Sequence, residues 1–174
     1  NISKRIARKF TEDARLVAEI GDFSSSCSMA AQPIYDRAGM VQFSPTSSHS
    51  AFAPGSPYSF SVSGTSQRQS SAIARIAVER LKKTKLAVLY LNTDWGVAEQ
   101  QAFVDEAQRL NVKIVAIESY PKETTDFTPM LEKLRAAQPE LLYLSSLYED
   151  GALISRHRQQ IGWDDVVVMG AGPL

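Results

Sequence analysis

The second half of the sequence alternates short apolar runs with amphipathic stretches. The apolar runs are four to six residues long and rich in leucine and β-branched residues: Leu86–Leu91, Val112–Ile117, Leu141–Leu144 and Val166–Met169. Runs of this length and composition are typical of strands buried on both faces of a parallel sheet. We therefore predict a strand at each of these positions.

Helical periodicity fills the segments between these runs, because apolar residues recur there at spacings of three and four. The sets that share a face are Ala98, Ala102 or Phe103, Ala107 and Leu110; then Phe127, Leu131 and Leu134; then Leu153, Ile154 and Ile161. Pro129 suits a first helical turn capped by Asp126 or Thr128, and Gly162 suits the position after a helix. Helices are therefore predicted between the strands.

The first half shows the same alternation of elements. Helices are predicted over residues 3–13, 25–38 and 66–83, and strands over 16–20, 41–43 and 58–62. Repeated strand, helix and strand imply right-handed crossovers and parallel sheets flanked by helices. The predicted fold class is α/β.

Composition and charge restrict the function. Nineteen basic and nineteen acidic residues give a net charge of zero, so no global field attracts nucleic acid or anionic lipid. One cysteine and two histidines leave too few soft ligands for a structural zinc site, and we predict no metal and no cofactor. No apolar run approaches the length of a membrane span, so direct membrane insertion is not expected.

Serine is concentrated in one part of the chain, with fifteen of its twenty copies between residues 24 and 71. Ser24, Ser25 and Ser26 follow the strand predicted at 16–20 and begin the next helix. A helix start presents free backbone N–H groups and the positive end of the helix dipole, to which hydroxyls would add donors. The pattern predicts a site for a carboxylate; the alternative is that one serine only caps the helix.

A second hydroxyl-rich segment, residues 44–50, follows the next strand. Because the carboxyl ends of neighbouring parallel strands meet at one edge of a sheet, we expect this segment to lie beside residues 24–26. Neither segment has the Gly-x-Ser-x-Gly pattern of a hydrolase nucleophile. We interpret His49 as an exposed loop residue and His157 as a residue on a solvated helix face.

Aromatic residues follow two strands of the second half. Asp94-Trp95-Gly96 comes after the first apolar run, and Ser145-Ser146-Leu147-Tyr148 comes after the third. Each aromatic either reaches a ligand from the edge of the sheet or belongs to the core. Gly170-Ala171-Gly172 lacks the third glycine and the following helix of a dinucleotide-binding loop.

Several short motifs occur along the chain in a particular order. They are Ile20-Gly21-x-x-Ser24-Ser25-Ser26, Pro33-Ile34-Tyr35-x-x-Ala38-Gly39, Ser44-Pro45, Asp94-Trp95-Gly96, Thr124-Thr125-Asp126-Phe127 and Gly162. This ordered set resembles the ABC-transporter substrate-binding proteins of the branched-chain amino acid (Leu/Ile/Val-binding) family, which have the type I periplasmic binding protein fold.

The resemblance implies two parallel-sheet lobes joined by hinge strands, which close on a small ligand. Family members are longer than this chain, so it implies a fragment: residues 1–63 as part of lobe one, and residues 64–174 as the hinge crossing and part of lobe two.

The resemblance assigns ligand-binding roles in lobe one by position. Ser25 matches the serine whose hydroxyl, with neighbouring N–H groups, holds the ligand carboxylate. Thr46 and Ser48 match the loop that contacts the carboxylate and the amino group of the ligand.

In lobe two, Trp95 takes the place of an aromatic that covers the ligand, and Leu147 or Tyr148 falls at a second aromatic position. Amino acid binders carry an acidic residue for the ligand ammonium where this chain has Gly172. A buried ammonium without a counter-charge is costly. We therefore expect an aromatic or aliphatic acid without an amine.

The resemblance implies the solute-binding component of an ABC transporter, which captures a small carboxylate-containing ligand, either an amino acid or an amine-free organic acid. Its partners would be that ligand and an ABC permease in the membrane, without nucleic acid. It would act in the periplasm or outside the cell, associated with the membrane through the transporter, and would not be an enzyme. The alternatives are a ligand-sensing domain of a regulator or receptor with the same fold, and an α/β hydrolase that uses Ser25.

Overall fold

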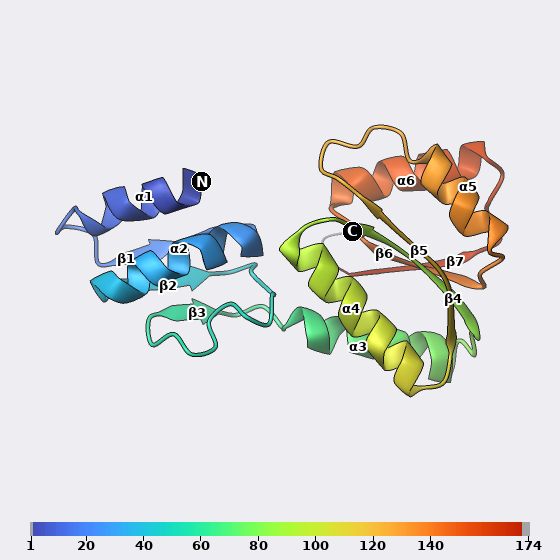
Figure 1. Cartoon of the computed structure of the whole chain (residues 1–174), viewed down its shortest axis with the longest axis horizontal. Helices are drawn as coiled ribbons and strands as arrows, with labels where there is room; N and C mark the ends of the chain where they lie inside the picture. The colour runs from blue at the N-terminus through green and yellow to red at the C-terminus, as the bar shows by residue number, and fades with distance from the viewer. Residues whose placement is uncertain (1, 172–174) are drawn as a thin grey trace. The chain divides into compact units, whose positions relative to one another are not determined.

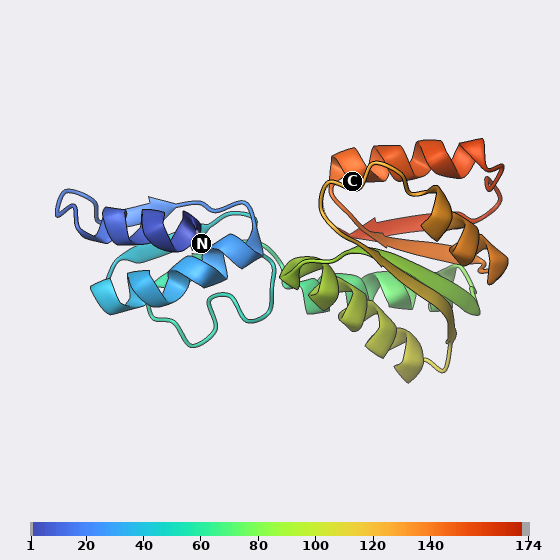
Figure 2. The ribbon, with the colours of Figure 1, turned by 45° about the horizontal axis from the view of Figure 1, so that its top comes forward.

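The computed structural model describes residues 2–171 and divides the chain into two compact units, Asn1–Ser66 and Gln67–Leu174 (Figure 1, Figure 2). Each unit contains its own parallel sheet with helices packed against it. This arrangement confirms the predicted α/β class. Within the described residues, none of the helices combines the length and apolar character needed to cross a membrane.

In the described part of the first unit, the strands form a parallel sheet in the order β1-β2-β3. The elements are α1 (Ile2–Thr11), β1 (Ala18–Ile20), α2 (Ser25–Ala38), β2 (Val41–Ser44) and β3 (Ser59–Ser61). α2 ends at Gly39, which has a φ of 65°. This is the left-handed conformation that glycine adopts most readily, and it lets β2 begin directly after the helix.

α1 packs against α2, and α2 covers one face of this sheet. The buried apolar side chains of this unit's core cluster are Ala7, Ala31, Ile34, Tyr35 and Met40. Gln42 of β2 is buried, and its Nε2 donates to the carbonyl of Ser28 in α2 at 3.1 Å. This contact fixes the first turns of α2 over the carboxyl end of β2.

In the described part of the second unit, four parallel strands lie in the order β5-β4-β6-β7. The elements are α3 (Ser66–Arg75), the π-helical turn η1 (Ile76–Arg80), β4 (Lys85–Leu91), α4 (Asp94–Arg109), β5 (Lys113–Tyr120), α5 (Thr128–Ala136), β6 (Leu141–Ser145), α6 (Tyr148–Gln160) and β7 (Val167–Ala171). The strands predicted from the four apolar runs are therefore confirmed, with shifts of a few residues at their ends.

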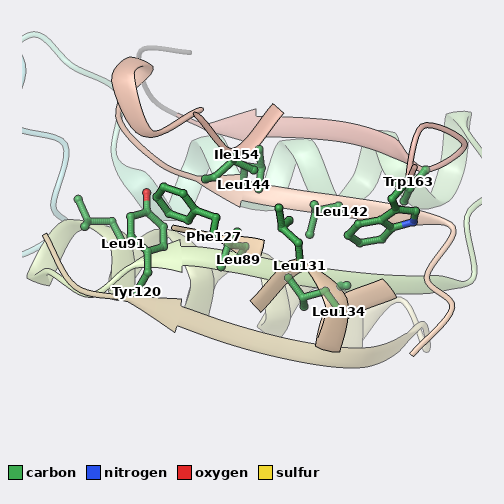
Figure 3. Close-up of a cluster of buried hydrophobic side chains, with 12 residues drawn as sticks. Leu89, Leu91, Tyr120, Phe127, Leu131, Leu134, Leu142, Leu144, Ile154 and Trp163 are labelled. Atoms are coloured by element: carbon green, nitrogen blue, oxygen red, sulfur yellow. The ribbon is translucent and has the colours of Figure 1, made fainter. Parts of the chain in front are cut away.

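Helices cover both faces of the second sheet, as Figure 2 shows. Leu89 of β4 packs with Leu131 of α5 and Ile154 of α6 in the core layer drawn in Figure 3. Leu86, also on β4, packs on the opposite face with Phe103 of α4. Burial on both faces explains why β4 and β6 are continuous apolar runs.

The helix predicted over residues 66–83 is α-helical only as far as Arg75. It then widens into η1, where the N–H of Leu81 donates to the carbonyl of Ile76, five residues earlier, at 3.0 Å. η1 spans only five residues, too few for the sequence periodicity to distinguish a π-turn from an α-helix.

Two strands of the first unit are shorter than predicted. The strand predicted over 16–20 begins at Ala18, whose partner Val41 is the first residue of β2. Val17 lies before the paired region and is 79% exposed. The strand predicted over 58–62 is limited to residues 59–61. Apolar residues continue beyond the paired residues of both strands, so the hydrophobic pattern predicted strands that are longer than those observed.

Glu106 on α4 is held between two arginines. Its Oε1 accepts from Arg109 Nη2 at 2.6 Å and from Arg75 Nη1 at 3.0 Å. The hydrogen bond from Arg109, followed by that from Arg75, lowers the pKa of Glu106 to about 2, although burial opposes this shift. Because the folded pKa lies below the ordinary 4.5, the ionised group stabilises the fold above pH 4.5, and this stabilisation is lost as the pH falls towards 2.

We expect Glu106→Gln to lower the free energy of unfolding by about 1–2 kcal/mol near pH 7, because it removes the charge of a carboxylate that accepts three hydrogen bonds from two partly exposed arginines. The loss should be smaller near pH 3, where much of the ionic contribution has already gone. Urea unfolding at both pH values measures it. Glu132→Gln, at an exposed position of α5, is the matched control. An equal loss at the two pH values would contradict the ionic explanation.

Candidate functional site

The turns that follow β1 and β2 meet at the carboxyl edge of the first sheet. We call residues 22–26 the α2 turn and residues 44–50 the β2 turn. Thr46 Oγ1 donates to the carbonyl of Phe23 at 2.9 Å, and Ser44 Oγ donates to the carbonyl of Asp22 at 2.8 Å. The predicted proximity of the two hydroxyl-rich segments is therefore confirmed.

A group of buried serines holds the two turns in place. Ser47 Oγ lies 2.7 Å from Ser28 Oγ and 2.8 Å from Ser44 Oγ. The N–H of Ser47 also donates to Ser44 Oγ at 3.0 Å. These hydroxyls are occupied by bonds within the protein, so they shape the turns, and other groups remain available to a ligand.

Ser25 is the first residue of α2 and is 3% exposed. Its Oγ accepts the backbone N–H of His49 at 3.3 Å, so its own hydroxyl hydrogen can be donated elsewhere. Ser24 is the N-cap residue, but its side chain makes no capping bond. Ser24 thus stands at the capping position without capping the helix through its side chain. The N–H groups of Cys27 and Ser28 donate to the Ser24 carbonyl, whereas those of Ser25 and Ser26 have no partner within the helix. Together with the helix dipole, they form a site suited to an anion.

Thr46 and Ser48 offer a ligand different groups. The hydroxyl hydrogen of Thr46 is engaged by the carbonyl of Phe23, which leaves lone pairs that can accept a hydrogen bond. Ser48 is buried, and its Oγ lies 3.2 Å from Ser66 Oγ, where either group can be the donor. Ser48 can therefore donate to a ligand when Ser66 supplies the hydrogen of their mutual bond.

Two carboxyl groups lie near the α2 turn. Burial and the charge of Asp22 raise the pKa of Glu19 to about 7, and burial raises the pKa of Asp22 itself. Within residues 2–171 neither forms an ion pair with a lysine or arginine. Because a pKa of about 7 leaves Glu19 partly neutral near neutral pH, the repulsion that this carboxyl exerts on an anion is weakened there.

Trp95 and Tyr148 occupy corresponding places in the second unit. They begin α4 and α6, after the neighbouring strands β4 and β6. Trp95 is half-buried, and Tyr148 is 60% exposed. Leu147, the alternative to Tyr148, is half-buried and packs against the core layer of Figure 3. Tyr148 is therefore the side chain that is available to a ligand at this position.

Phe23 is a candidate that the sequence interpretation missed. Its side chain is 60% exposed in the α2 turn, directly before Ser24, while its carbonyl is fixed by Thr46. The available signal was a large aromatic residue between the end of a predicted strand and the serine cluster. Such an exposed aromatic beside polar donors can supply an apolar contact to a ligand.

The interpretation of His157 as a solvated residue is wrong. Its side chain is 15% exposed, and its Nδ1 accepts the N–H of Phe127 at 3.2 Å. Asp126 Oδ1 accepts the N–H of Thr128 at 2.9 Å, so both side chains stabilise the start of α5. His49 is half-buried, and its Nδ1 accepts a backbone N–H at 3.0 Å.

Among the described residues, no group of three or more His, Cys, Asp or Glu side chains could hold a metal ion. Gly172, on which the prediction of an amine-free ligand depends, lies outside the described residues.

Comparison with known proteins places the whole chain in one group. A family model described as "Periplasmic binding protein" matches residues 1–174. Among curated proteins, an amino acid binding protein from Pseudomonas aeruginosa is 27% identical over 157 residues, which cover 89% of this chain and 42% of the relative. The chain thus spans about half the length of the curated relatives that it matches.

Solved structures share the fold. A leucine-binding protein from Thermotoga maritima has a TM-score of 0.87 at 21% identity, covering 97% of this chain and 48% of that one. A solute-binding protein of an ABC transporter from R. palustris, in complex with 4-hydroxybenzoate, has a TM-score of 0.90 at 18% identity, covering 98% of this chain and 47% of that one.

Proposed function

Since the chain belongs to the periplasmic binding protein family, we propose that it forms part of the solute-binding component of an ABC transporter and captures a small ligand that bears a carboxylate. This proposal rests on one structural observation. The α2 turn and the β2 turn converge where α2 begins, and there Ser25 keeps a hydroxyl hydrogen beside N–H groups without helical partners. Such donors match carboxylate oxygens.

The related proteins support this class of ligand. Leucine and 4-hydroxybenzoate, named for two proteins of the same fold, both carry a carboxylate. Only leucine carries an amine. We favour an amine-free acid for this chain, because the family resemblance matches Gly172 to a position where amino acid binders have an acidic residue, and an ammonium without a counter-charge would be costly to desolvate.

Aromatic side chains would complete the recognition of such an acid. In this proposal Phe23, which is 60% exposed in the α2 turn, supplies an apolar contact in the first unit. Trp95 and Tyr148 are proposed separately as ligand contacts of the second unit. The face of Phe23 would contact the apolar part of the ligand, and the hydroxyl turns would hold its charged end.

The proposed activity is binding and release without chemical change. A hydrolase would need a histidine base for Ser25. Instead, Ser25 Oγ accepts the backbone N–H of His49, and the Nδ1 of that histidine accepts another backbone N–H. The proposed partner is a membrane permease, and the proposed location is the periplasm.

Isothermal titration of the full-length protein tests the ligand class. The titrants are leucine, isoleucine, benzoate, 4-hydroxybenzoate and the neutral 4-hydroxybenzamide. We expect an aromatic acid to bind at least about tenfold more tightly than the amide, because the amide lacks the charge that the donors complement. Tight binding of leucine would contradict the amine-free version alone. Failure of every acid, or equal binding of the amide, would contradict the proposed function.

Ser25→Ala locates the site in the same experiment. We expect the acid to bind about tenfold more weakly, because a hydrogen bond to its carboxylate is lost. Ser50→Ala, at an exposed position of the β2 turn, is the matched control and should stay within about twofold of the wild type. Equal effects of the two substitutions would place the ligand elsewhere.

A further inference from the structure

Ser66, which is the last residue of the first unit and the first residue of α3, contacts the β2 turn. The N–H of Ser66 donates to the carbonyl of Ser48 at 2.7 Å, and the two side-chain oxygens lie 3.2 Å apart. Ser66 is fully buried, and Ser48 is 7% exposed. Ser66 therefore fixes both the backbone and the hydroxyl of one candidate ligand-binding residue.

Either hydroxyl can be the donor in the hydrogen bond between Ser48 and Ser66, so two arrangements of the pair are available. Each hydroxyl has one hydrogen and two acceptor lone pairs. When Ser48 donates to Ser66, it has no hydrogen for a ligand. When Ser66 donates to Ser48, the hydrogen of Ser48 is free to be donated to a ligand. The bond from Ser66 to Ser48 then strengthens the bond from Ser48 to the ligand, because each polarises the other.

We propose that Ser66 is a positioning residue for ligand binding: it donates to Ser48 when a carboxylate is bound, so that Ser48 can donate to the carboxylate. This inference rests on the proposed function, because it names how the same site favours an anion. Ser66 itself does not contact the ligand. Its contribution passes entirely through Ser48, and this makes it separable from a general effect on folding.

A double-mutant cycle tests the proposal on the full-length protein, with 4-hydroxybenzoate and leucine as the titrants. Ser66→Ala should weaken binding of the acid that the wild type binds by about fivefold, because Ser48 loses the donor that orients and polarises its hydroxyl. In a Ser48→Ala background the same substitution should have an effect below about twofold. Ser71→Ala, a half-buried serine of the same helix whose Oγ contacts the carbonyl of Ala102, controls for loss of a helix hydroxyl. Equal effects of Ser66→Ala in both backgrounds would overturn the proposal.

Hydrogen exchange of the ligand-free protein gives a second readout. Ser66→Ala should increase deuterium uptake by the peptide that covers residues 44–50, and Ser71→Ala should not. If neither acid binds the wild type, the proposed ligand class fails, and this measurement alone decides whether Ser66 orders the turn. Unchanged uptake with Ser66→Ala would overturn the inference, whatever the ligand.

Discussion

Replacing Gly96 with alanine should destabilise the second unit by about 3 kcal/mol or more, because the new side chain meets backbone that cannot move aside. Gly96 lies in the first turn of α4, where its N–H donates to Thr93 Oγ1 at 3.2 Å. A β-carbon there would overlap the carbonyl oxygen of Leu91 at the end of β4. Relief would require separating α4 from β4.

Chemical denaturation followed by tryptophan fluorescence measures this loss, since Trp95 and Trp163, the two tryptophans of the sequence, both belong to the second unit. Gly162→Ala is the matched comparison. Gly162 has a φ of +66° but open space where a β-carbon would stand, so its replacement should cost about 1–2 kcal/mol of backbone strain. If Gly96→Ala were the milder of the two, close backbone approach would not explain the glycine.

The interior strands of the second sheet, β4 and β6, could be predicted because they are buried on both faces. Burial of that kind leaves a continuous apolar run such as Leu86–Leu91, and the helices beside it must be amphipathic. The strand order could not be predicted. Strands that are apolar on both faces do not specify their neighbours, and only the structure shows β4 between β5 and β6.

The general location of the candidate site followed from topology, whereas the roles of its serines did not. Neighbouring parallel strands bring their carboxyl ends together, so two hydroxyl-rich turns had to meet. The side chains of Ser25 and Ser47 are chemically identical. One keeps its hydrogen beside the start of α2, and the other bonds to serines within the protein. That difference depends on distances between residues remote in sequence, as does the contact of His157 with the start of α5.

Replacing Phe103 with alanine should lower the free energy of unfolding by about 4 kcal/mol, the cost of losing a buried aromatic and leaving a cavity. Phe103 is fully buried on α4, and its ring stacks on Tyr143 of β6 with centroids 4.0 Å apart and planes at 5°. The Tyr143 hydroxyl is bonded to Ser70 Oγ at 2.6 Å. That bond restrains the tyrosine from moving into the space left by Phe103.

Tyr143→Phe separates packing from hydrogen bonding in the same layer. It keeps both rings and removes only the hydroxyl, so urea unfolding should show a loss of about 1–2 kcal/mol. In the double variant Phe103→Ala/Tyr143→Phe, the freed ring can relax into the cavity, and the combined loss should be smaller than the sum of the two single losses. Strict additivity would show that the Ser70 bond does not restrain Tyr143. A loss from Phe103→Ala no greater than that from Tyr143→Phe would mean that the stacked pair does not hold α4 to the sheet.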